Sequence, residues 1–140
     1  MAAVAAYSLS ERLYEYLTPI AWLEHQWLRA AGIVLLLSSL AWTVVAQAQM
    51  GESWRIVIDE ERRTPLVWKG VFGVSKNPIF LGMMLTLLGL FLVIPNAVML
   101  LIFVLGVVLI QIQVRLEEEF LSNTHGAEYA QYRRGVRRWL

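Results

Sequence analysis

The sequence predicts an all-α protein, an integral membrane helical bundle with about three transmembrane helices in a single domain over residues 1–140. Its composition is 58% hydrophobic and 16% charged, whereas soluble domains carry about 25% charged residues. The charges are also segregated, because residues 30–51 and residues 77–114 carry none. A helix that crosses a bilayer needs roughly 20 mostly apolar residues, so both stretches are long enough to span.

An amphipathic helix is expected near the N-terminus, over residues 8–28, with aromatic residues and leucines on a broad face. Pro19 interrupts this helix, since proline cannot donate a backbone hydrogen bond. Trp22 and Trp27 suit the headgroup region of a membrane, where an indole ring is half buried. The helix either lies in the membrane interface or forms a short additional span. The first span follows over residues 30–49.

The long uncharged stretch predicts a helical hairpin. Its 38 residues from 77 to 114 would form one helix about 57 Å long, nearly twice the hydrocarbon thickness. Pro95 and Asn96 lie at its midpoint, where proline ends one helix and asparagine caps the next. We therefore expect two spans within residues 79–115, with helices over 79–93 and 97–115.

The hairpin also predicts the orientation of the chain. A hairpin returns to its starting side, so the polar connector over residues 51–76 and a helical tail over residues 116–138 share one face. Both segments are rich in lysine and arginine, which the positive-inside rule assigns to the cytosol. The sequence thus predicts a multi-pass integral membrane protein, embedded in the lipid bilayer, with any active site facing the cytosol.

Composition excludes several classes of function. The spans carry no ionisable side chain, which argues against a carrier that binds cations at membrane depth. The absence of cysteine excludes thiolate chemistry, and a net charge of +1 does not suit a nucleic-acid partner. His25 and His125 fall on opposite predicted sides of the membrane, so no metal site is expected.

The start of the hairpin is the first candidate for chemistry. Pro78 suits the first turn of a helix and Asn77 suits its cap. Free amides at such a helix start, with the charge of Lys76, can hold a carboxylate or hydroxyl groups. The same three residues also fit an ordinary capped membrane helix with a snorkelling lysine.

Acidic and aromatic residues after the hairpin are the other candidates. Glu117–Glu119 spread over about 200° of a helix, so only one or two can face inward and bind an ammonium or a ribose. They also fit a solvated acidic end of a span. Tyr129 and Tyr132 lie three residues apart on one helix face, where they can cover a purine or pack against the membrane.

In order and spacing, these patches resemble the isoprenylcysteine carboxyl methyltransferase family and its phospholipid methyltransferase relatives. The resemblance covers roughly residues 50–138, about two thirds of the chain. In place of the family's Arg-His-Pro-x-Tyr, this chain has Lys76-Asn77-Pro78-Ile79-Phe80. The matching segments are Met50–Arg55, Thr64–Val67, Gly70, Ser75–Gly82, Glu117–Leu121 and Gly126–Tyr132.

The resemblance implies an integral-membrane methyltransferase whose methyl donor is S-adenosylmethionine, bound on the cytosolic side. Our own hypothesis is that Glu118 and Lys76 are the catalytic residues. One of the two glutamates Glu117 and Glu118 would bind the ammonium or hydroxyls of the donor, and Lys76 would hold the donor's carboxylate or the acceptor. The complete cofactor-binding set implied by the resemblance is Lys76, Asn77, Pro78, Ile79, Phe80, Glu117, Glu118, Tyr129, Tyr132 and Arg133.

The expected acceptor is lipophilic or partitioned into the membrane, with a carboxylate, amine or thiol that enters from the bilayer between helices. A homodimer is compatible with so thin a bundle. Two alternatives stay open at this point. One is an NADPH-dependent enzyme like the membrane sterol reductases, and the other is a small membrane scaffold without catalytic activity.

Overall fold

The computed structural model describes residues 16–51 and 67–140, and this part of the chain is helical. No strand is formed within it, apart from two isolated β-bridges. The all-α prediction is therefore confirmed for the described residues. The elements are the 3-10 helices η1 (Ala21–Leu23) and η3 (Gly70–Gly73) and the α-helices α3 (Gln26–Met50), α4 (Pro78–Val93) and α5 (Ala97–Gly135).

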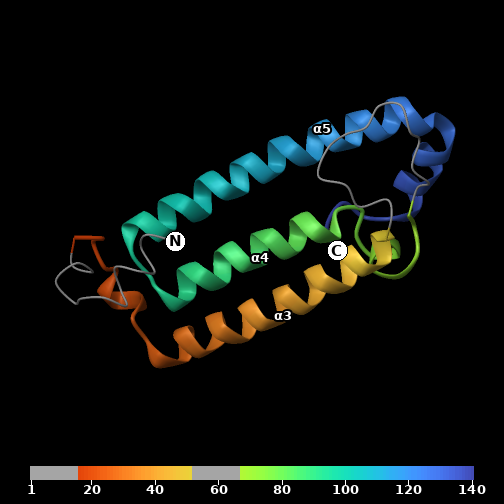
Figure 1. Ribbon diagram of the computed structural model, residues 1–140. Coiled ribbons are helices and arrows are strands. Elements are labelled where there is room, and N and C mark those ends of the chain that lie inside the picture. Colours follow the sequence, from red (N-terminus) through yellow and green to blue (C-terminus); the bar gives the residue numbers. More distant parts are fainter. Residues whose placement is uncertain (1–15, 52–66) are drawn as a thin grey trace.

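The three α-helices lie lengthwise beside one another, with α4 between α3 and α5 (Figure 1). Helix α4 runs antiparallel to both neighbours, and α5 extends well beyond the start of α4 (Figure 1). At its far end the chain folds back, so that the C-terminus lies near the start of α4 (Figure 1). This return brings the last residues of the chain to the end of the bundle at which α4 begins.

Where the hairpin is predicted, the structure has the two helices α4 and α5. Helix α4 has Pro78 in its first turn, where the missing N–H costs no helical hydrogen bond. Asn96 precedes α5 and is fully buried. Its side-chain oxygen accepts a hydrogen bond of 2.8 Å from the backbone N–H of Met99, which satisfies one of the free donors at the helix start.

Small and hydroxylated residues bring α3 and α4 close together. A Cβ atom at Gly32 would lie 2.9 Å from the backbone oxygen of Gly89, so both helix backbones approach at this crossing. The hydroxyl groups of Ser39 and Thr86 lie 2.9 Å apart across the same interface. Packing of small residues and hydrogen bonds between helices are the interactions that hold helices together in a membrane.

Two helices, α3 and α5, are long and apolar enough to cross a membrane by length and composition. Helix α4 has 16 residues and is about 24 Å long, shorter than a hydrocarbon core of roughly 30 Å. Many apolar side chains of α3 and α5 are exposed. Such continuous apolar surface is typical of contact with lipid.

The helix predicted over residues 8–28 is not continuous in its described part, where only residues 26–28 are α-helical, as the start of α3, and residues 8–15 lie outside the described residues. Between residues 16 and 25 the structure forms a turn and the short helix η1. The backbone pairs with the hairpin turn instead: Ile20 N–H donates to Pro95 at 2.8 Å, and Ala97 N–H donates to Thr18 at 3.0 Å. This long-range pairing, together with the left-handed φ of 53° at Thr18, replaces helical hydrogen bonds.

Two other boundaries differ from the predictions. Helix α3 begins at Gln26, four residues before the predicted span over 30–49. The predicted helical tail is continuous with α5, which turns only at Gly126 with φ of 49° and ψ of −114°. Glycine tolerates this left-handed region without the clash of a Cβ atom. Of the predicted connector, residues 52–66 lie outside the described residues.

Candidate active site

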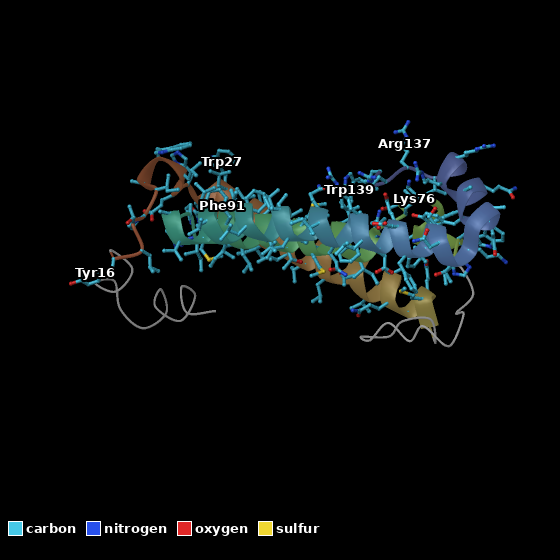
Figure 2. The ribbon with its side chains drawn as sticks, turned by 90° about the horizontal axis from the view of Figure 1, so that it is seen from above. Tyr16, Trp27, Lys76, Phe91, Arg137 and Trp139 are labelled. Carbon is cyan, nitrogen blue, oxygen red and sulfur yellow. The ribbon has the colours of Figure 1, made fainter. Side chains whose placement is uncertain are left out.

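One end of the bundle brings together three segments that are distant in the sequence. They are the approach to α4 over residues 75–78, the middle of α5, and the final non-helical residues 136–140, which we call the C-terminal strap. Figure 2 shows Lys76 and Arg137 at this end, whereas Tyr16 and Trp27 lie at the opposite end. The strap forms a parallel bridge between Arg137 and Ser75.

Hydrogen bonds fasten the backbone of the strap to the approach to α4. The backbone N–H of Lys76 donates to the carbonyl oxygen of Arg137 at 3.0 Å. The carbonyl oxygen of Arg138 accepts from the Ser75 hydroxyl and from the Asn77 side-chain amide, each at 3.3 Å. Ser75 and Asn77 are buried, so these bonds are partly shielded from water and hold the strap in place.

Glu118 is the centre of this cluster. It is buried, with 7% of its surface exposed. Its carboxylate accepts two hydrogen bonds from the Arg138 guanidinium, with Nε at 3.0 Å and Nη2 at 2.7 Å. The Asn77 amide donates at 3.4 Å, and the Lys76 Nζ atom lies 3.9 Å away. Charge-assisted bidentate contacts of this kind are among the strongest hydrogen bonds in proteins.

The three consecutive glutamates have different environments. Glu118 is buried, Glu117 is half-buried and Glu119 is exposed. Successive side chains on a helix point in directions about 100° apart, so only one of the three can face the cluster. Burial raises the pKa of the Glu117 carboxyl, which lies beyond the uncharged part of α5. The inward-facing member of the pair is Glu118.

Lys76 is a second buried ionisable group, with 8% of its side chain exposed. Burial lowers the pKa of its ammonium group, while the negative charge of Glu118 acts in the opposite direction. The positive charges of Arg133 and Arg138 lower the pKa further. The cluster therefore holds two buried ionisable groups of opposite sign, and the carboxylate stabilises the charged form of the amine.

Tyr129 and Tyr132 are both buried in the short helix after Gly126. Their ring centroids lie 6.1 Å apart at an interplanar angle of 51°. Burial is the main cause that raises the pKa of each phenol to about 12, so both hydroxyl groups stay neutral donors at physiological pH. The Tyr132 hydroxyl donates to the carbonyl oxygen of Phe72 at 2.6 Å, which ties this helix to η3.

Replacing Tyr132 by phenylalanine is expected to destabilise the fold by about 1–2 kcal/mol, because the buried Phe72 carbonyl would lose its donor. Chemical unfolding in mixed micelles measures this difference. Tyr16→Phe is the matched control, since Tyr16 is 85% exposed and its substitution should change the unfolding free energy by less than about 0.5 kcal/mol. Equal stability of the two variants would contradict a structural role for the Tyr132 hydroxyl.

Comparison with known proteins adds an independent observation. A model of the phospholipid methyltransferase family matches residues 27–128, well over half of the chain. The chain belongs to the phospholipid methyltransferase family. No curated protein and no solved structure matches it. Membership identifies an enzyme of the methyltransferase kind and, together with the apolar helices α3 and α5, a membrane protein.

This phospholipid methyltransferase family member carries part of the predicted residue set in one cluster. Lys76, Asn77 and Glu118 contact one another. Pro78 is buried, and its carbonyl oxygen accepts a hydrogen bond of 2.8 Å from the Trp42 indole. Among the remaining predicted residues, Ile79, Phe80 and Glu117 are half-buried, Tyr129 and Tyr132 are buried, and Arg133 is exposed.

Arg138 and Ser75 are the cluster residues that sequence reasoning misses. Arg138 enters the sequence argument only as part of a basic tail, although it makes the closest contacts to Glu118. It follows Glu118 by 20 residues, and the turn at Gly126 lies between them. No helical repeat pairs residues at that spacing. The signal in the sequence is Gly126, because a glycine can adopt the positive φ at which the chain reverses.

Proposed function

We propose that this protein is an integral-membrane methyltransferase that uses S-adenosylmethionine to methylate a lipophilic acceptor. The observation that carries the proposal is the buried Glu118 carboxylate, held between Asn77, Lys76 and Arg138 in a chain of this family. Burying charges costs free energy that a salt bridge often does not recover, so such a cluster is a candidate binding site.

The residues present fit the amino-acid part of such a donor. A carboxylate offers about four lone-pair positions, and Glu118 uses three of them for its hydrogen bonds with Asn77 and Arg138. One position is left for an ammonium or a hydroxyl of the donor. Lys76 provides positive charge for the donor's carboxylate. S-adenosylmethionine supplies an activated methyl group on a sulfonium.

The side chains of this chain would act by alignment and by exclusion of water. Methyl transfer from a sulfonium needs the acceptor in line with the methyl group, and no covalent enzyme intermediate. Glu118 and Lys76 are both less than 10% exposed in their side chains, so they act in a partly desolvated environment in which charges interact more strongly than in water.

The proposed acceptor is a membrane-partitioned carboxylate, amine or thiol. Support comes from the exposed apolar surfaces of α3 and α5, along which a lipophilic molecule could reach the cluster from the bilayer. We place the site on the cytosolic side, because basic residues gather at this end of the bundle. They are Lys69, Lys76, Arg115, Arg133, Arg134, Arg137 and Arg138.

The test uses the full chain purified in detergent. We expect calorimetric titration to show saturable binding of S-adenosylmethionine and its product S-adenosylhomocysteine, and we expect no binding of NADPH. Incubation with a membrane lipid extract and a donor labelled in its methyl group should transfer label to an organic-soluble product. Binding of NADPH alone would favour the reductase alternative, and binding of neither molecule by the folded protein would favour a scaffold.

A further inference from the structure

The Arg138 guanidinium has an edge that the Glu118 contact does not use. An arginine side chain carries five N–H donors, and two atoms, Nε and Nη2, donate to Glu118. The Arg138 side chain is 44% exposed, whereas those of Glu118 and Lys76 are 9% and 8% exposed. One edge of the planar group therefore faces the buried carboxylate, and the remaining donors face outward.

The position of this outward edge is determined by the backbone. The carbonyl oxygen of Arg138 accepts from Ser75 and Asn77, and the preceding carbonyl accepts from the Lys76 N–H. The Glu118 carboxylate then restrains the side chain through two hydrogen bonds. Because both ends of Arg138 are held, little conformational entropy remains to be lost when a ligand binds the free donors.

The charges around this edge match a zwitterion. Lys76 and Arg138 are positive and Glu118 is negative, so the group carries two positive charges and one negative charge. Among the described residues, no partner occupies the outward donors of Arg138 or one lone-pair position of the buried Glu118 carboxylate. A free α-amino acid group has a carboxylate and an ammonium on the same carbon, which suits an adjacent donor edge and acceptor.

We propose that Arg138 binds the carboxylate of the methyl donor's amino-acid part, while its other edge holds Glu118 toward the donor's ammonium. This inference rests on the proposed function and adds a binding residue to it. Arginine suits this position better than lysine, because a planar guanidinium can contact two carboxylates at once along different edges. Arg138 is thus a determinant of selectivity for donors that carry a carboxylate.

The experiment compares two ligands in calorimetric titrations of the detergent-purified full chain. One is S-adenosylhomocysteine and the other is the same molecule without its carboxylate. The wild-type protein is expected to bind the complete molecule about 10 to 100 times more tightly, the range for hydrogen bonds to charged groups. Arg138→Gln is expected to remove this preference, because binding of the complete molecule should weaken about 10-fold or more beyond any loss that the other ligand suffers through the released Glu118.

Two variants serve as controls. Arg137→Gln removes the neighbouring charge, whose side chain is exposed and points away from the bundle (Figure 2), and it should keep the preference of the wild type. Arg138→Lys keeps the positive charge but not the planar guanidinium. It should therefore retain a reduced preference for the ligand with a carboxylate, and the thermal unfolding profile of the wild type. This variant keeps the test valid if Arg138→Gln does not fold.

The other possible outcomes distinguish failure of the Arg138 inference from failure of the proposed function. If wild-type protein binds both ligands equally, or if Arg138→Gln weakens both equally, Arg138 does not contact the carboxylate and the inference is overturned while the proposed function stands. If folded wild-type protein binds neither ligand, the proposed function is overturned and this inference with it.

Discussion

Glu118→Gln is expected to lower both donor affinity and the rate of methyl transfer about 100-fold or more. The reason is that removing one partner of a buried charge cluster leaves the other charges uncompensated. Glutamine has nearly the same volume as glutamate, so the change removes the charge and not the packing. It leaves Lys76 and Arg138 without their counter-charge. Titration with S-adenosylhomocysteine measures the first effect, and transfer of labelled methyl to lipid extract measures the second.

Glu119→Gln is the matched control for this prediction. It makes the same chemical change one position further along α5, where the side chain is exposed. Affinity and rate should stay within about 2-fold of wild type, because exposed charges on a helix contribute little. If both substitutions have the same effect, the burial of Glu118 has no functional meaning and the assignment of the site is wrong.

Gly32→Val is expected to destabilise the bundle by about 2–4 kcal/mol, the upper range for overpacking of a tight interface. A Cβ atom at this position would lie 2.9 Å from the Gly89 carbonyl oxygen and 3.0 Å from Leu92 Cβ. Both are atoms that cannot rotate away, so α3 and α4 would have to separate. Unfolding of the purified protein in mixed micelles of increasing sodium dodecyl sulfate content gives the difference in stability.

Gly106→Ala provides the comparison, because its added Cβ would meet only the side chain of Leu87, with the Cδ1 atom at 2.5 Å. That atom is the tip of a flexible side chain, which can change rotamer at a cost of about 1 kcal/mol or less. The close approach of α3 and α4 would be refuted if Gly32→Val proved no more harmful than Gly106→Ala. We also expect Gly32→Val to reduce donor affinity, since separation would break the Trp42 contact at the start of α4.

The helices could be predicted from local sequence because their limits have local causes. Pro95 and Asn96 end one helix and cap the next whatever surrounds them, and the structure has α4 and α5 on either side of them. The structure of the segment over residues 16–25, by contrast, depends on residues far away in the sequence. Its backbone bonds to residues 95 and 97, which lie more than 70 positions away, so its aromatic pattern suggested a helix that tertiary pairing replaces.

The sequence predicted that acidic and basic residues meet at the start of the hairpin, but it identified only some of the residues that form the cluster. Helical geometry limits how many of Glu117–Glu119 can face inward, but the choice of Glu118 depends on how α5 rotates against the strap. Lys76 and Asn77 follow from the start of the hairpin. Arg138 does not follow from any spacing, because a reversal at Gly126 brings it back to Glu118.

The contacts that assemble the cluster join residues far apart in the chain, and this has a consequence for the order of folding. Phe72 and Tyr132 are separated by 60 positions, Ser75 and Arg138 by 63. The entropy lost in closing such loops is recovered only after α3, α4 and α5 have met. Packing of the helices therefore precedes completion of the cluster, and a chain arrested between these two events has its three helices in place but lacks the assembled cluster.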